Sequence, residues 1–204
     1  MTAGQVMVRG RMQARVVRAQ RASLNWRLRN TLRLDYLWGW LVYHVGMGFS
    51  KLTGVPVLLG KLEALLIRAD GSKVNYGVLG YRMVTTAFVN FMVDQLQTET
   101  SEWGDFKYHD SGVGTTDPAV GDTDIETTDG ESRATGTQLE GASANIYKSV
   151  GTISYTSTKA ITEHGLFSQA TGTTLMDRSE FAAINVVSGD SIQFSYELSC
   201  SAGG

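Results

Sequence analysis

The chain has 204 residues, of which 42% are hydrophobic, and its formal net charge is −2. This length fits one domain or a domain with a substantial arm, and this apolar fraction is too low for a membrane protein. Cys200 is the one cysteine, which excludes a disulfide scaffold. The small net charge hides an asymmetry: residues 1–100 contain 13 basic and 5 acidic residues, and residues 101–204 contain 5 basic and 15 acidic ones. Such asymmetry favours an oppositely charged partner or a head-to-tail contact between copies.

The first 34 residues are rich in arginine and contain no acidic residue. Arg11, Arg15 and Arg18 lie at i, i+4 and i+7, which predicts one basic stripe of a helix. Contact with nucleic acid or an acidic protein, a membrane-surface helix and a targeting peptide all fit this pattern, and a solvated helix without a partner is the alternative. A nucleic-acid partner is not expected, because no recognised nucleic-acid-binding module follows the arginines.

Residues 36–49 form the most apolar stretch of the chain. These 14 residues are fewer than the roughly 20 that a spanning helix needs, so a core or interface helix is predicted rather than a membrane span. Its aromatic side chains would be strong anchors beneath another subunit. The expected partner-binding residues of the arm are therefore Arg11, Arg15, Arg18, Arg27, Trp38, Trp40 and Tyr43.

A more ordinary globular pattern begins near residue 61. Residues 64–68 and 74–78 read as two strands joined by a tight turn at Asp70-Gly71. A helix is predicted over 84–97, with Thr85 or Thr86 as its N-cap. The apolar side chains expected to face a sheet are Phe88, Phe91 and Met92.

Residues 109–142 form a long polar stretch, which we interpret as an extended surface loop with short strands. Its acidic residues offer oxygen ligands that could hold calcium, although the spacing of an EF-hand is missing. A solvated acidic loop is the preferred interpretation. The residues of the calcium alternative are His109, Asp110, Asp117, Asp122, Asp124 and Glu126.

The end of the chain is β-rich, with candidate strands over 147–155, 160–167, 174–187 and 191–198. The last of these alternates strictly between apolar and polar residues, and Ser188-Gly189-Asp190 precedes it as a turn. Several short strands at such spacing predict a sandwich or a jelly-roll-like barrel. We therefore expect an α+β, mainly β protein. A basic and aromatic N-terminal arm over 1–60 precedes a domain over 61–204, in which a β-hairpin and one packed helix lead into an antiparallel, jelly-roll-like β-sandwich.

Signatures of the common enzyme classes are absent from the sequence. Glu163-His164 and Asp177-Arg178 offer acids, a base and an ion pair, but a strand would place Glu163 and His164 on opposite faces. A buried Asp177–Arg178 or Glu163–Arg178 contact that fixes a strand end is preferred. No catalytic residue, cofactor or resident metal is expected.

Several segments carry a further pattern: EHGLF at 163–167, LMDR at 175–178 with Phe181, and SGDSIQFSY at 188–196. This pattern resembles a group of structural proteins of tailed-phage particles, and VTTAFVNFMVDQLQ (84–97) and KYHDSGVGTT (107–116) are similar to the same group. A fainter likeness connects EHGLF to tail-collar fibre domains. The resemblance covers about residues 62–204 and does not include the arm.

The resemblance implies a non-enzymatic component of a virion. The first expectation is a capsid decoration or cement protein that forms homo-oligomers and contacts the major capsid protein. The alternative is a tail, neck or fibre-attachment protein that contacts tail or portal proteins. A third class, a glycan-binding or glycan-cleaving tail module, would need paired carboxylates such as Glu163 and Asp177 in an aromatic cleft.

Overall fold

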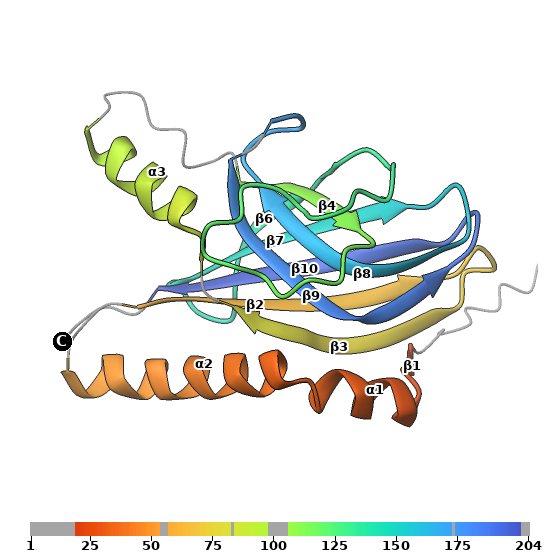
Figure 1. The fold of residues 1–204 in the computed structure, drawn as a ribbon, viewed down its shortest axis with the longest axis horizontal. Coiled ribbons are helices and arrows are strands. Elements are labelled where there is room, and N and C mark those ends of the chain that lie inside the picture. Colours follow the sequence, from red (N-terminus) through yellow and green to blue (C-terminus); the bar gives the residue numbers. More distant parts are fainter. Residues whose placement is uncertain (1–18, 54–56, 83, 98–105, 173, 201–204) are drawn as a thin grey trace, which may run out of the picture.

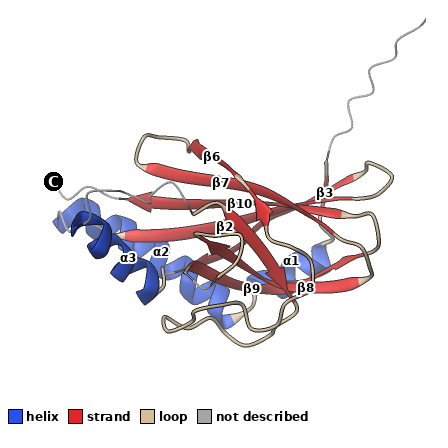
Figure 2. Cartoon of the chain, turned by 90° about the horizontal axis from the view of Figure 1, so that it is seen from above, coloured by secondary structure: helices blue, strands red, loops and turns tan. Residues whose placement is uncertain are grey.

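The computed structural model describes residues 19–53, 57–82, 84–97, 106–172 and 174–200. They form two sheets packed face to face, with three helices outside them (Figures 1 and 2). The expected α+β, mainly β sandwich is confirmed. The six-stranded sheet has the order β1 (Gln20–Arg21), β3 (Lys73–Arg82), β2 (Leu58–Ile67), β10 (Ser191–Cys200), β7 (Ile146–Ser154) and β6 (Thr137–Glu140). The four-stranded antiparallel sheet has the order β5 (Ala134–Thr135), β4 (Tyr108–Gly112), β8 (Lys159–Phe167) and β9 (Leu175–Val186).

The alternation of β10 defines one side of the core. Its apolar side chains are buried and face the other sheet, while their sequence neighbours point outwards, as period 2 requires. β10 pairs with β2 on one side and with β7 on the other, both antiparallel. The strand nearest the C-terminus therefore joins two distant parts of the chain. The buried side chains of β10 are Ile192, Phe194, Tyr196 and Leu198.

The predicted hairpin and the predicted helix are both confirmed. β2 and β3 pair antiparallel around a turn in which Gly71 has φ +80°, a conformation that favours glycine. Helix α3 (Thr86–Gln97) begins after Thr85, whose Oγ1 accepts a hydrogen bond from the Phe88 backbone N–H at 3.2 Å. Phe88 is fully buried and Phe91 and Met92 pack against the core, as expected.

Thr85 also donates a hydrogen bond to the Leu175 carbonyl oxygen, 2.5 Å away, and therefore ties α3 to β9. Replacing Thr85 by alanine is expected to lower the free energy of unfolding by about 1–2 kcal/mol, because a helix cap and a buried hydrogen bond are lost together. Chemical denaturation checks this. The exposed neighbour Thr86 provides the control, since Thr86→Ala should change stability by less than about 0.5 kcal/mol.

Helices α1 (Leu24–Thr31) and α2 (Leu34–Thr53) lie end to end along one side of the sandwich, beside β3 (Figure 1). α1 is tied to β9 by Trp26, whose ring N–H donates to the carbonyl oxygens of Ala182 and Ala183, both at 3.0 Å. α2 can lie close to the sheet because Gly39 has no Cβ, and a Cβ at this position would overlap the Tyr81 carbonyl oxygen. Within the part of the arm that the structure describes, both helices are packed on the sandwich.

Candidate interaction surface

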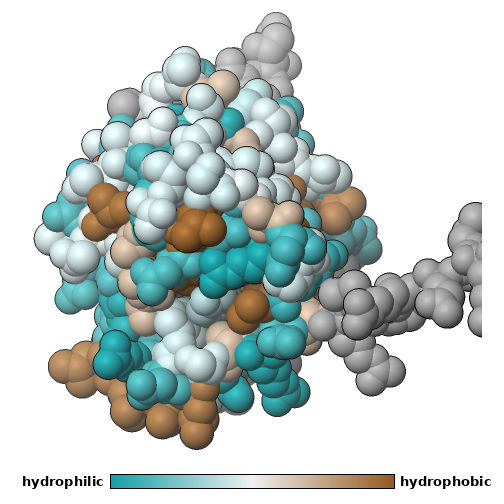
Figure 3. All heavy atoms as spheres, turned by 90° about the vertical axis from the view of Figure 1, so that its right-hand side faces the viewer, coloured by the Kyte–Doolittle hydropathy of each residue, from teal (hydrophilic) through white to brown (hydrophobic). Residues whose placement is uncertain are grey.

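The outward side of α1 and α2 is strongly apolar. Eleven large hydrophobic side chains on these helices and their connection are 43–86% exposed, whereas four are exposed among the other side chains that the structure describes. Figure 3 shows hydrophobic residues gathered along the lower edge, the side on which α1 and α2 lie in Figure 1. An apolar surface of this extent is typical of an interaction site. We call it the apolar helix face; it consists of Leu24, Leu28, Leu32, Leu34, Leu37, Trp38, Trp40, Leu41, Val45, Phe49 and Leu52.

The structure places the expected partner-binding residues in different positions. Trp38 and Trp40 belong to the apolar helix face and are 64% and 46% exposed. Arg27 is exposed on α1. Tyr43 is half-buried and faces the protein's own sheet, with its hydroxyl 3.3 Å from Ser199 Oγ and its ring centroid 4.9 Å from that of Tyr81. The three remaining candidates, Arg11, Arg15 and Arg18, lie outside the described residues.

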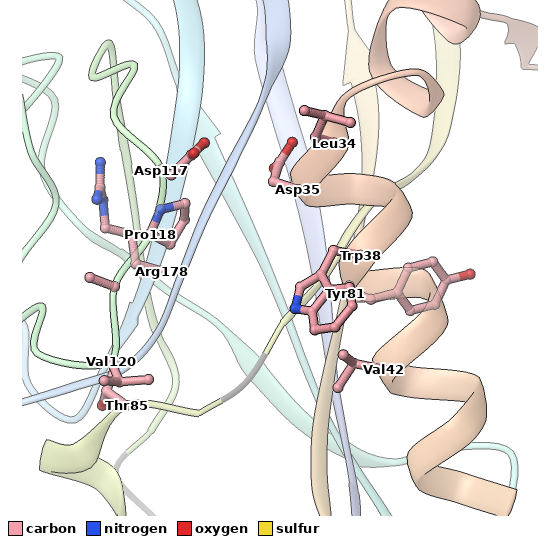
Figure 4. A pocket seen from close by; sticks show the side chains of 12 residues that line it. Leu34, Asp35, Trp38, Val42, Tyr81, Thr85, Asp117, Pro118, Val120 and Arg178 are labelled. Atoms are coloured by element: carbon pink, nitrogen blue, oxygen red, sulfur yellow. The ribbon is translucent and has the colours of Figure 1, made fainter.

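A cleft of about 380 Å³ opens beside the apolar helix face, between α2 and the loop 117–120 (Figure 4). Trp38 and Val42 form its wall on the helix side, and Pro118 and Val120 line the loop side. Such a cleft suits a large apolar side chain of a partner protein.

Three carboxylates meet beside this cleft, and two of them, Asp35 and Asp117, line it. One oxygen each from Asp35, Asp117 and Glu180 lies within 4.8 Å of the others, and Asp117 is exposed. Arg33 forms ion pairs with Asp35 and Glu180 and offsets much of this negative charge. The guanidinium therefore already provides the positive charge that these two carboxylates require.

The calcium alternative for the 109–142 stretch receives little geometric support, because most of its acidic side chains face arginines. Asp122 lies 3.0 Å from Arg178, and Asp110 lies 2.9 Å from Arg133. His109 points into the core and away from the loop. Of the six residues considered for calcium, only Asp117 belongs to the carboxylate cluster in the described part of the chain.

Glu163 and Arg178 form a buried ion pair, with Arg178 Nε 2.9 Å from Glu163 Oε2. This contact between β8 and β9 confirms the expected Glu163–Arg178 pair. Glu163 also accepts backbone hydrogen bonds from Gly114, Glu126 and Thr127 at 2.8–2.9 Å. A single carboxylate therefore fixes both sides of the long loop, and the loop is ordered by contacts within the protein.

A second buried polar cluster was not predicted from the sequence. His109 on β4 and His164 on β8 are fully buried, with His109 Nδ1 3.0 Å from His164 Nε2. The other ring nitrogen of His109 lies 2.8 Å from Ser149 Oγ on β7, so this chain of contacts crosses from one sheet to the other. Burial lowers the pKa of His109 to about 4, and burial together with the neighbouring His109 lowers the pKa of His164 well below its usual value.

Comparisons with protein-family models, with curated proteins and with solved structures found no match for this chain. Among the helices that the structure describes, none combines the length and apolarity that crossing a bilayer requires.

Proposed function

We propose that this protein is a non-enzymatic structural component of a tailed-phage particle, and specifically a capsid decoration or cement protein. In this role the sandwich is a rigid support, and the apolar helix face binds neighbouring subunits of the shell. The observation that carries the proposal is the apolar helix face itself. A protein that acted alone would expose these side chains to water, at a cost of about 25 cal/mol for each Å² of apolar surface that a partner would otherwise cover.

The buried polar clusters support a role in binding rather than in catalysis. His109, His164 and Glu163 are fully buried, and none of them lines the cleft between α2 and the loop 117–120. The Glu163 carboxylate already accepts four hydrogen bonds. A general acid or base must reach its substrate, and these groups are occupied with holding strands and loops together.

The residues that carry the resemblance to phage particle proteins stabilise the fold. Glu163 and Arg178 join β8 to β9 and hold the long loop. Asp190, in the turn before β10, accepts hydrogen bonds from the backbone N–H groups of Val187 and Ala69, both at 3.0 Å. This pattern is therefore compatible with a shared architecture whose binding surface differs from protein to protein.

A tail, neck or fibre-attachment protein is the second candidate, because the apolar helix face would suit docking on a hub equally well. A glycan-binding or glycan-cleaving module is less favoured. Its two carboxylates would be Glu163 and Asp177, and both are fully buried.

The number of copies in a particle separates the two leading candidates. Quantitative protein staining of purified virions is expected to show hundreds of copies for a shell protein. A count of about a dozen would overturn the cement proposal and support the tail assignment, and absence from purified virions would overturn both.

Substitution in the apolar helix face should prevent incorporation. Leu41→Glu places a charge at the centre of α2 on its exposed side, so the fold should persist while a covered interface would have to bury that charge. We expect particles assembled with this variant to contain at least about tenfold less of it, measured by quantitative mass spectrometry. Leu139→Glu is the matched control, because Leu139 is 49% exposed on β6, away from the helices, and should not affect incorporation.

A further inference from the structure

We propose that α2 pairs antiparallel with α2 of a second copy of this chain, around a two-fold axis near Tyr43. This inference rests on the proposed function and names the partner of the apolar helix face. It comes from one row of exposed residues along α2, which recur at intervals of four, three, four, three and four. We call this row the seam; it consists of Leu34, Trp38, Leu41, Val45, Gly48 and Leu52.

A 3,4 spacing is the pattern with which one helix packs along another. The five large residues of the seam are 43–86% exposed, and Gly48 has open space around the position of a Cβ. The opposite side of α2 packs on the protein's own sheet, where Gly39 meets Tyr81 and Gly46 meets Leu59. Among the described residues nothing covers the seam, which is therefore a helix-pairing surface on a helix whose other side is packed on the sheet.

The seam is complementary to itself when the second helix runs in the opposite direction. With the two-fold axis at residue 43, Trp38 of each copy lies opposite Gly48 of the other, and the largest side chain of the seam meets its smallest residue. Leu41 then lies opposite Val45, and Leu34 lies opposite Leu52. A two-fold interface requires this reciprocity, in which residue i contacts residue j and j contacts i. In a parallel pair, Trp38 would face Trp38 and Gly48 would face Gly48, which leaves one layer overfilled and another empty.

Charge does not oppose this pairing. Between Asp35 and Lys51 the sequence of α2 contains no Asp, Glu, Lys or Arg, and His44 is its one basic residue. Two such helices can approach along about 30 Å without bringing carboxylate, ammonium or guanidinium groups of like charge together. Leu37 and Phe49 flank the seam, are 46% and 51% exposed, and would extend the covered apolar surface on both sides.

The first test is association of the full chain. Sedimentation equilibrium at about 1–100 μM is expected to show a dimer, with Leu41→Glu shifting the dissociation constant upwards at least about 100-fold, since each pair of helices would carry two buried charges. The control Leu139→Glu should remain as dimeric as the parent. A parent chain that stays monomeric throughout this range overturns the proposal, and so does a dimer that Leu41→Glu leaves unchanged.

The second test fixes the direction of the helices. In a Cys200→Ser background, which removes the exposed native thiol, Trp38→Cys is mixed with Gly48→Cys and mildly oxidised. The antiparallel pair places positions 38 and 48 at the short Cα separation that a disulfide needs, whereas two copies of position 38 are about 15 Å apart. A cross-linked product in the mixture, and none with Trp38→Cys alone, is expected. Cross-linking with Trp38→Cys alone, or no cross-link in the mixture, overturns the antiparallel arrangement.

The two levels of the proposal fail in different ways. A dimer that is absent from purified virions would contradict the particle function and leave the pairing intact. A monomer that still enters particles through the apolar helix face would show that another virion protein covers the seam, and would overturn the pairing alone. Circular dichroism of each variant confirms that the sandwich remains folded.

Discussion

Replacing Glu163 by glutamine is expected to destabilise the protein by about 3–5 kcal/mol, measured as the free energy of unfolding in urea. Oε1 of Glu163 accepts from the backbone N–H groups of Gly114 and Thr127, and Oε2 accepts from Glu126 N–H and Arg178 Nε. A glutamine presents an NH₂ group in place of one of these oxygens. Two backbone or side-chain donors would then face another donor, and in either orientation Arg178 would lose the negative charge of Glu163 at a buried site.

The control for this change is Glu140→Gln, which removes the same charge from an exposed position on β6. It should alter stability by less than about 0.5 kcal/mol. Limited proteolysis gives an independent measurement, because the 113–133 loop is held by Glu163 and Arg178 and should be cut faster in the Glu163→Gln variant. Equal stability of the two variants would mean that the buried carboxylate is not what orders the loop.

Acidification from pH 6.5 to pH 5 should destabilise the protein by about 1.5 kcal/mol for each of His109 and His164. In the folded protein the pKa of His109 is lowered to about 4 and that of His164 is lowered well below its usual value, whereas both take up a proton near pH 6.5 when unfolded. The unfolded state therefore binds more protons throughout this window, and stability falls as pH falls. Carboxylates of ordinary pKa remain ionised between pH 5 and 6.5, so most of the slope in this range is expected from the histidines.

The measurement is the urea midpoint at half-unit steps of pH. A variant with both histidines replaced, His109→Gln and His164→Leu, should lose most of the slope between pH 6.5 and 5, whatever its absolute stability. His44→Gln is the control, because His44 is exposed on α2, and this variant should keep the slope of the parent. A parent protein whose stability is flat over this range would contradict burial of the pair in its neutral form.

The elements that could be predicted from the sequence are those specified by local pattern. The alternation of 191–198 gives β10, Asp70-Gly71 gives the β2–β3 turn, and Thr85 with the apolar spacing of 84–97 gives α3. The apolar stretch 36–49 was correctly expected to be a helix, although its inward and outward sides could not be separated. Both sides are apolar, and only contact with β3 distinguishes them.

The features that could not be predicted depend on contacts between distant residues. β4 reads as part of a polar loop, yet His109, Asp110 and Ser111 are buried in it. Each is accommodated by a partner far along the chain: His164, Arg133 and Tyr155 respectively. Polar residues enter a strand interior only when such hydrogen bonds exist, and no local pattern shows them. The Glu163–Arg178 pair could be predicted as one of two alternatives, because its members belong to two consecutive candidate strands.

The glycines beneath α2 have a consequence for the energetics of binding. Gly39 allows the helix backbone to rest directly on β3, because a Cβ at this position would overlap the Tyr81 carbonyl oxygen, and Gly46 lies over the Leu59 side chain of β2 at ordinary contact distance. Tyr43 lies between them and also faces the sheet. Rotation of α2 about its own axis would therefore break the contacts that Gly39, Tyr43 and Gly46 make with the sheet. The outward residues are therefore preorganised before any partner arrives, and association costs little conformational entropy in the helix backbone. Gly39→Ala changes none of the outward residues, but its Cβ would overlap the Tyr81 carbonyl oxygen and displace α2 from β3. This substitution is accordingly expected to weaken assembly only through the packing of α2 on the sheet.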